Sequence, residues 1–442
     1  MKGLPTEAEA RQLATRVLAA VRRIKTADGN VRLSATRAGN TRFAVNEITS
    51  SADVDRVELS VTVQLGKRAA TATTNQLDDR SVADVVDRAH RMAKLAPENP
   101  EAMPALGAQI YKRAKAAADP ATVKLTPDAR AKAAGAAIAS GDGAKVAIAG
   151  FYEHAQRALA LASTAGLWAY HAWTTAGMTA TARTPDGTGS GWAGASSNRG
   201  ADVDAGALAK LAVDKAVRSQ KPTRLDPGRY TVILEPAATA AMLSFLVGAL
   251  SARRADEGRS YFAKPGGTRV GDKLFPDAIT LRSDPTDAQL AATPFDREGV
   301  PIAPATWIDK GTLKGLAYDR YWAKKQGKPP TGRPDGWILD GGKATTEQLL
   351  AGVKRGVLVT RMWYLRSLDP QTLLVTGLTR DGTFLVEDGK ITRPVMNFRF
   401  NESPVQMLGK CDALGVPVLV SGMRVPALRT HEFNLASISE AV

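Results

Sequence analysis

Residues 229–254 read RYTVILEPAATAAMLSFLVGALSARR, and this stretch carries the clearest structural signal in the chain. Its first six residues, 229–234, include Tyr, Thr, Val, Ile and Leu, a composition typical of a strand. Pro236 then stands where a helix would begin, a position that tolerates the missing N–H of proline. The residues that follow are apolar on nearly every side up to about Arg254, as in a helix buried in a core or an interface. The stretch therefore predicts a strand at 229–234 and a buried helix over 236–254.

Downstream of this helix, the sequence is rich in glycine, proline and short extended runs. The clusters Lys264-Pro265-Gly266-Gly267, Asp381-Gly382 and Asp388-Gly389 predict turns. Short strands separated by such turns are typical of a curved sheet or a barrel-like β domain. We therefore predict a β-rich C-terminal domain over residues 226–442.

Upstream, helical and extended patterns alternate. In residues 1–98, a helical pattern over 7–25 precedes the alternating strand 57–65, its hairpin partner 68–74 and a second helix over 81–95. In residues 99–225, helical patterns near 127–139 and 204–217 flank extended runs that begin at Val146. A linker, Ala96-Pro97-Glu98-Asn99-Pro100, separates the two segments. The prediction is an α+β protein with an N-terminal α+β domain (1–98), a middle α+β domain (99–225) and the β-rich domain (226–442).

Composition narrows the class of protein. The chain has 442 residues, 44% hydrophobic and 23% charged, which is the balance of a soluble globular protein. No apolar run reaches eighteen residues, the first residues lack a secretory pattern, and Cys411 is the only cysteine. These features predict a cytoplasmic protein with no membrane segment. The net charge of +15 would attract nucleic acid, but the basic residues form only pairs, so we do not expect a nucleic-acid partner.

An ordered set of short motifs resembles the TldD/PmbA family, whose members were once described as modulators of DNA gyrase. Five motifs lie in the C-terminal segment and one lies upstream, and the N-terminal pattern that ends in Ala96-Pro97-Glu98 also fits. The resemblance therefore covers nearly the whole chain, although no single motif is specific. The six motifs are Leu234-Glu235-Pro236-Ala237-Ala238, Phe295-Asp296-Arg297-Glu298-Gly299-Val300, Ile308-Asp309-Lys310-Gly311-Thr312-Leu313, Gly377-Leu378-Thr379-Arg380-Asp381-Gly382, the run from Val386 to Val395, and the run from Thr184 to Trp192.

The resemblance implies a zinc site that this chain lacks. TldD-like members carry HExxxH on the helix after the Leu-Glu-Pro motif, where two histidines bind zinc and the glutamate takes a proton from the metal-bound water. Those positions align here with Ser244, Phe245 and Ala249. The family's cysteine ligand is also missing, because Cys411 lies upstream of its expected place in a segment that reads as an ordinary turn. We therefore expect no catalytic residue and no metal in this chain.

This pattern resembles the TldE/PmbA branch, which implies a supporting subunit. Such a subunit pairs with a TldD-like partner that holds the zinc, and the two chains degrade or trim unfolded or small peptides. The expected partner is therefore a TldD-like metallopeptidase subunit, with a homodimer as the alternative. A peptide would be held as an added strand, where main-chain hydrogen bonds give affinity with little sequence preference.

Other reactive residues have a structural interpretation beside the functional one. Ser244 lacks an adjacent base, so a packing role is favoured over a nucleophile. Cys411 is interpreted as an inert thiol. No pair among His90, His154, His171 and His431 has helical ligand spacing, and His431-Glu432 is only half of a zinc motif, so we interpret it as a surface pair.

Three further patterns also allow both a functional and a structural interpretation. Asp296, Glu298 and Asp309 could form a paired-carboxylate site, but a polar turn between strands is favoured. Gly187, Gly189 and Gly191 follow no βαβ pattern, so we interpret them as a flexible loop rather than a dinucleotide site, one that in this family could border the substrate channel. The run Met362-Trp363-Tyr364 is assigned to the core rather than to a groove.

Two other functions stay open at this point. The basic charge and the family's older description suggest a nucleic-acid or gyrase-associated binding protein, which would bind DNA in a strongly salt-dependent way. The third hypothesis is a self-sufficient peptidase with an unrecognised site. No nucleophile and base stand together in the sequence to support it.

Overall fold

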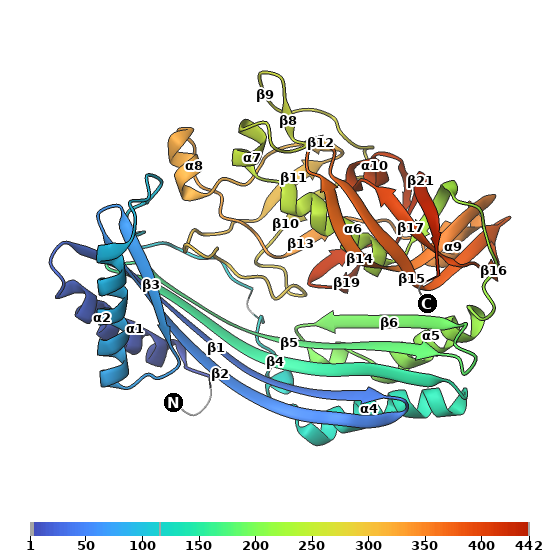
Figure 1. The fold of residues 1–442 in the computed structure, drawn as a ribbon, viewed down its shortest axis with the longest axis horizontal. Coiled ribbons are helices and arrows are strands. Elements are labelled where there is room, and N and C mark those ends of the chain that lie inside the picture. Colours follow the sequence, from blue (N-terminus) through green and yellow to red (C-terminus); the bar gives the residue numbers. More distant parts are fainter. Residues whose placement is uncertain (1–3, 115, 441–442) are drawn as a thin grey trace.

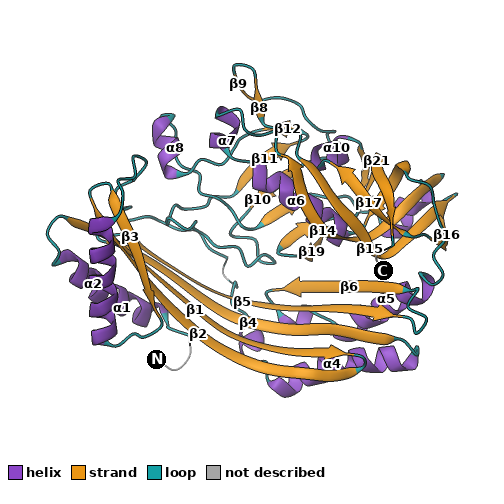
Figure 2. Cartoon of the chain, viewed as in Figure 1, coloured by secondary structure: helices purple, strands orange, loops and turns teal. Residues whose placement is uncertain are grey.

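The computed structural model describes residues 4–114 and 116–440 (Figure 1). A large curved sheet made by the first half of the chain lies beside a C-terminal domain of two smaller sheets and short helices (Figure 2). The predicted α+β class is confirmed. None of the helices within the described ranges is long and apolar enough to cross a membrane.

The large sheet has six antiparallel strands in the order β3-β2-β1-β4-β5-β6. Its strands are β1 (Ala27–Ala44), β2 (Glu47–Leu65), β3 (Arg68–Thr74), β4 (Ala147–Ser163), β5 (Trp168–Arg183) and β6 (Ser190–Ser197). The first and middle segments of the chain each supply three strands, which join where β1 pairs with β4. The expected boundary near residue 98 therefore falls between two halves of one sheet.

Helices cover one face of this sheet. They are α1 (Glu7–Arg22), α2 (Asp79–Leu95), α3 (Pro120–Val123), α4 (Pro127–Gly143) and α5 (Ala205–Arg218), with a short 3-10 turn at Gly200–Asp202. Helices α1 and α2 pack on β1 and β2 around Val17, Leu33 and Leu59, whereas α4 and α5 pack on β4 to β6 around Ile148 and Met178. Because strand side chains alternate, the opposite face carries the polar residues of the same strands.

The C-terminal domain contains a closed five-stranded barrel. Its strands pair in the order β14-β7-β21-β17-β15, and β15 returns to pair with β14. They are β7 (Gly228–Leu234), β14 (Arg355–Asp369), β15 (Leu374–Glu387), β17 (Asn397–Glu402) and β21 (Leu428–Ser439), with β16 (Lys390–Pro394) and β18 (Cys411–Leu414) attached. Closure removes the two free edges that an open five-stranded sheet would expose.

A second six-stranded sheet completes the domain, in the order β12-β11-β10-β13-β20-β19. Its strands are β10 (Leu281–Ser283), β11 (Ala305–Asp309), β12 (Thr312–Leu313), β13 (Trp337–Leu339), β19 (Val418–Val420) and β20 (Met423–Val425); β8 (Ala263–Lys264) and β9 (Gly267–Thr268) form a separate hairpin. The helices are α6 (Pro236–Ala249), α7 (Ala252–Asp256), α8 (Arg320–Lys325), α9 (Thr346–Ala351) and α10 (Pro404–Gly409). Helix α6 contributes Met242, Leu243 and Leu246 to the core shared by the two sheets.

The predicted helix over 236–254 is two helices. Helix α6 ends at Ala249, because Leu250 leaves the helical region with a ψ of 54°. Helix α7 then begins after Ser251, whose side chain accepts the N–H of Arg254. The apolar pattern continued through this break, so sequence periodicity alone did not reveal it.

The predicted flexible loop at Thr184–Gly191 is a packed turn. The Thr184 N–H donates to the Gly189 carbonyl, and this turn joins β5 to β6. A Cβ on Gly189 would lie 2.3 Å from the Ala216 carbonyl oxygen, and one on Gly191 would lie 2.2 Å from that of Ala212. Both glycines are therefore required for the close approach of β6 to α5.

Two other predictions of local structure were wrong. Asp381-Gly382 is a bulge inside β15 rather than a turn, with φ angles of 56° and 118°. The segment Met407–Asp412 is the end of α10 and the start of β18 rather than a turn.

Candidate functional site

Two adjoining cavities lie between the polar face of the large sheet and the C-terminal domain. The larger has a volume of about 690 Å³ and the smaller about 350 Å³, and they share Arg32, Arg297, Glu298 and Asp319. We call the two together the interdomain cleft. Its sheet side is hydroxyl- and amide-rich, with Asn30, Ser60, Thr62, Gln64 and Thr71. A polar groove of this size can accommodate an extended peptide.

Helix α6 borders the smaller cavity with the end that carries Gly248. Ser244 lies one turn earlier, on the same helix face, and is exposed. Its hydroxyl donates to the carbonyl oxygen of Ala241, three residues earlier in the same helix, at 2.7 Å. Phe245 packs against the domain core, and Ala249 is buried. A hydroxyl, a phenyl ring and a methyl group do not form a zinc-binding donor set, so these residues do not fit the family's metal.

No other place within residues 4–114 and 116–440 brings together three His, Cys, Asp or Glu side chains that could hold a metal ion. The four histidines are spread over α2, β4, β5 and β21, and are His90, His154, His171 and His431. His431 contacts Asp412 through Nε2 at 3.0 Å and Thr231 through Nδ1 at 3.0 Å. Its neighbour Glu432 pairs with Lys410 at 2.8 Å. Both residues of the predicted surface pair are thus engaged locally.

Cys411 is buried beside the barrel core. Burial raises the pKa of its thiol to about 12, so the thiol stays protonated near neutral pH. A protonated, buried thiol is neither a nucleophile nor a ready metal ligand.

His171 is a buried imidazole on β5 that stacks on Trp173, with ring centroids 5.2 Å apart. Burial, aided by the charge of Arg113, lowers its pKa to about 4, and its Nε2 atom has no hydrogen-bond partner. His154 lies on β4, and burial together with the charge of Arg130 lowers its pKa as well. Both imidazoles are therefore uncharged at neutral pH.

Two of the three predicted carboxylates meet in the smaller cavity. Asp296 accepts the N–H groups of Glu298 at 2.8 Å and Val300 at 3.0 Å, as expected of a polar turn. Burial raises the pKa of Asp296, and burial together with the charge of Asp296 raises the pKa of Glu298. Asp309 does not join them, because it lies on β11 and pairs with Lys314 at 3.7 Å.

Two more carboxylates, Asp319 and Asp335, line this cavity, and neither was identified from the sequence. Asp319 accepts the Trp322 N–H at 2.7 Å, and Asp335 accepts the Thr293 N–H at 3.1 Å and the Thr293 hydroxyl at 2.7 Å. The Asp335 carboxylate is reachable by solvent, but protein surrounds it on most sides, and this burial raises its pKa. Carboxylate oxygens accept hydrogen bonds, so this cavity suits a polar ligand with N–H groups, such as a peptide main chain.

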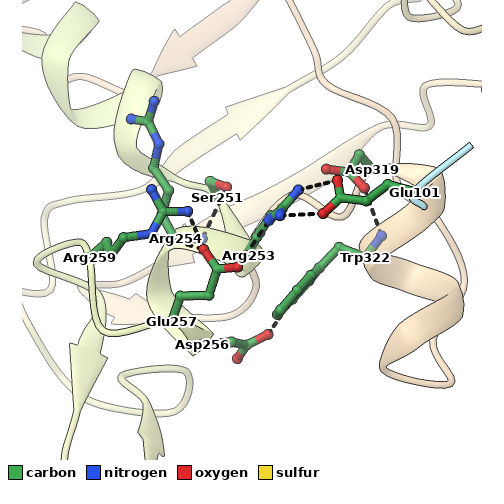
Figure 3. Close-up of polar contacts among 9 residues, drawn as sticks. All are labelled: Glu101, Ser251, Arg253, Arg254, Asp256, Glu257, Arg259, Asp319 and Trp322. Atoms are coloured by element: carbon green, nitrogen blue, oxygen red, sulfur yellow. Dashed lines mark hydrogen bonds and ion pairs between the residues drawn. The ribbon is translucent and has the colours of Figure 1, made fainter. Parts of the chain in front are cut away.

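One wall of the larger cavity is held by an ion-pair network around α7 (Figure 3). The Arg253 guanidinium donates to both oxygens of Glu101, at 2.8 and 2.7 Å, and its Nε donates to Glu257 at 3.1 Å. Arg253 lowers the pKa of Glu101, and these carboxylates raise the pKa of Arg253. Because Glu101 belongs to the linker after α2, this network ties the linker to the C-terminal domain.

A second tie lies at the other end of α6. Lys215 on α5 forms a largely buried ion pair with Glu235, the residue that precedes α6, at 2.6 Å. Ser190 on β6 donates to the buried carboxylate of Asp381 on β15, also at 2.6 Å. These contacts fix the barrel and α6 against the large sheet, and so define the shape of the cleft between them.

Comparisons with known proteins identify the family of this chain. Residues 227–437 match the PmbA/TldA metallopeptidase C-terminal domain, and residues 98–220 match the PmbA/TldA metallopeptidase central domain. A metalloprotease of Methanothermobacter thermautotrophicus is 25% identical over 227 residues, covering 47% of each chain. The metalloprotease PmbA of Escherichia coli O157:H7 is 28% identical over 180 residues, covering 39% of this chain and 38% of that one. These matches thus span less than half the length of the curated relatives.

The fold is shared with solved structures over almost the whole chain. TldE from Thermococcus kodakarensis superposes with a TM-score of 0.85 at 18% identity, covering 96% of this chain and 99% of that one. A protein of Bacteroides thetaiotaomicron described as a putative modulator of DNA gyrase superposes with a TM-score of 0.84 at 20% identity, covering 96% and 98%. At these identities the likeness establishes the fold.

The fold, with its cleft beside a helix that follows a Leu-Glu-Pro motif, is that of a metallopeptidase-related protein. More narrowly, the two matched domain models show that the chain belongs to the TldD/PmbA family.

Proposed function

We propose that this chain is the metal-free, non-catalytic subunit of a two-chain zinc metallopeptidase that degrades or trims unfolded or small peptides. Zinc and the attacking water would belong to a TldD-like partner subunit. This chain would supply one wall of the chamber in which a peptide is held.

The side chains of α6 are the observation that carries this proposal. By the resemblance, α6 stands where TldD-like members carry their zinc ligands, yet Ser244, Phe245 and Ala249 offer no imidazole and no carboxylate. Because Phe245 packs against the core and Ala249 is buried, the helix acts as a support for the cleft rather than as a ligand carrier.

The polarity of the cleft supports a peptide as the ligand. One wall presents hydroxyl and amide side chains, which can pair with main-chain groups of any sequence. The other wall combines arginines with carboxylates, so it carries both signs of charge: Arg297, Arg320, Arg333, Asp296, Glu298, Asp319 and Asp335. Such a surface suits peptides without strong preference for their side chains.

The proposal is tested by the zinc content of the purified chain, alone and mixed with the TldD-like subunit of the same organism. We expect no stoichiometric zinc in the chain alone, and a stable complex that contains zinc after mixing. Stoichiometric zinc in the lone chain would overturn the proposal, because residues outside α6 would then bind the metal.

The smaller cavity supports a second candidate, a peptidase that uses its own carboxyl groups. Raised pKa values in paired carboxyl groups are typical of acid–base sites. Under this candidate the lone chain would cleave peptides in the presence of a chelator, and Asp335→Asn would abolish the cleavage.

A further inference from the structure

An exposed aromatic and arginine patch lies on β14, outside the interdomain cleft. Trp363, Tyr364 and Leu368 are 41%, 55% and 53% exposed, and Arg366 between them is exposed too. We call these four residues the β14 patch. The long ribbons of β14 and β15 cross the C-terminal domain in Figure 1. The sequence had assigned Trp363 and Tyr364 to the core, and that prediction was wrong.

A β-bulge explains why the two rings lie at the surface. Trp363 pairs with Leu378 and Arg366 with Thr376, so Tyr364 and Leu365 together face Gly377. Tyr364 takes a left-handed conformation with a φ of 55°, which is strained for a bulky side chain. As a result Leu365 packs against the core, while Trp363 and Tyr364 lie next to each other with ring centroids 5.5 Å apart. A regular strand would have put them on opposite faces.

Arginines stack on both exposed rings. Arg380 lies 4.2 Å from the Trp363 ring centroid, and Arg366 lies 4.4 Å from that of Tyr364. A further arginine–ring stack lies deeper in the structure, where Arg361 stacks on Trp192 at 4.9 Å. Arg361 also pairs with the buried Asp381 at 3.4 Å. The inner residues join the barrel to β6 of the large sheet. The outer residues make a surface that the rest of the chain does not cover.

The chemistry of the β14 patch fits an acidic protein surface. Tryptophan, tyrosine and arginine are the residues that dominate binding energy at protein interfaces. A guanidinium that stacks on a ring by its face turns its N–H edge outward, where it can bind a carboxylate. The stacked arginines already cover one face of each ring, which leaves less room for the base stacking of single-stranded nucleic acid. A second copy of this chain would also carry a net charge of +15 and Arg366 in the same patch, so like charges would oppose its docking.

We propose that the β14 patch is the docking surface for an acidic partner protein. This inference rests on the proposed function, under which that partner is the zinc-bearing TldD-like subunit. Trp363 and Tyr364 would insert into its surface, and Arg366 would pair with its carboxylates.

The test is the dissociation constant between the full-length chain and the TldD-like subunit of the same organism, measured by calorimetry at about 0.15 M salt. Trp363→Ala/Tyr364→Ala is expected to weaken binding about 30-fold or more, as for truncated interface anchors. Arg366→Glu is expected to weaken it about tenfold and to reduce its salt dependence. Leu95→Ala and Ile110→Ala are matched controls, because their side chains are 87% and 89% exposed elsewhere. Thermal melts verify that each variant folds.

The outcomes separate this inference from the function on which it rests. If the parent chain binds the subunit and the double variant binds equally well, the docking surface is wrong and the function stands. If the parent chain does not bind the subunit at all, both the docking surface and the proposed function are wrong. Self-association of the parent chain, or its binding to a single-stranded oligonucleotide, that the double variant loses would overturn the acidic partner in favour of a second copy or of nucleic acid.

Discussion

Helices α6 and α7 are separated by two residues, yet they are built in opposite ways. Helix α6 has no charged residue, and its buried side chains join the core of the C-terminal domain. Helix α7 is five residues long and carries Arg253, Arg254 and Asp256, which take part in the network of Figure 3. The contrast shows that charged side chains hold segments of the chain together at α7, whereas α6 packs its apolar side chains into the core. Under the proposed function, α6 would be a scaffold without zinc ligands.

The largest expected effect concerns the buried face of α6. Leu246→Ala removes a fully buried side chain, and we expect it to lower the free energy of unfolding of the C-terminal domain by about 3–4 kcal/mol. Ser244→Ala, on the exposed face, is the matched control and is expected to change it by less than about 0.5 kcal/mol. Urea denaturation followed by tryptophan fluorescence measures both. Equal effects would mean that α6 has no scaffold face.

A comparably large effect concerns His171, a buried polar group of the large sheet that has no ion-pair partner. Its pKa is about 4 when folded and about 6.5 when unfolded, so the unfolded state binds the proton first as the pH falls. Above pH 6.5, His171 should therefore not lower the free energy of unfolding. Between pH 6.5 and 4, the free energy of unfolding should fall by about 3 kcal/mol, at 1.36 kcal/mol per pH unit.

His171→Phe keeps a ring that can stack on Trp173 and should flatten this part of the pH profile, as measured by denaturation between pH 7 and 4. His90→Gln on α2 is the control and should retain the drop, because His171 is still present. A His171→Phe profile identical to that of the parent chain would show that another group causes the acid sensitivity.

A smaller effect is expected for the network around α7. Arg253→Met leaves Glu101 without its bidentate partner, so the linker should detach more often from the C-terminal domain. We expect faster limited proteolysis near residues 99–104 and a lower melting temperature, with a shift smaller than that of Leu246→Ala. In a double-mutant cycle, Glu101→Gln should add little to Arg253→Met. Arg254→Met is the control, since its part in the network is a backbone N–H; equal cleavage in both variants would refute the tie.

The smallest expected effect is that of restoring one ligand. Ser244→His places an imidazole on the exposed face of α6, but one imidazole with no second ligand cannot form a zinc site. We expect no measurable zinc uptake and a stability change within about 0.5 kcal/mol. Tight zinc binding by this variant would mean that other ligands already point at position 244.

Local patterns predicted most elements of the fold. The strand at 229–234, the hairpin 57–74 and the amphipathic helices near 7–25, 81–95 and 204–217 are confirmed, because each follows from the periodicity of its own segment. The pairing of β1 with β4 was not predicted, because it joins segments more than a hundred residues apart. The break after Ala249 was missed because the apolar pattern runs through it.

Prediction of the site was less complete. The expected replacement of zinc ligands at Ser244, Phe245 and Ala249 rests on the resemblance and stays a prediction. Asp335 was missed because its cavity is assembled from segments around residues 32, 248, 296 and 335, with no motif near Asp335 itself. The exposure of Trp363 and Tyr364 was missed because a bulge turns both rings outward, and no residue type in this segment indicates a bulge.

The most direct test of the central claim is peptidase activity on an unstructured peptide, measured for the purified chain alone, for the TldD-like subunit alone and for their mixture. The scaffold account predicts no cleavage by this chain alone and cleavage by the mixture that a chelator abolishes. Cleavage by this chain alone at a rate comparable to that of the mixture would contradict it, and would place the chemistry in this chain's own residues.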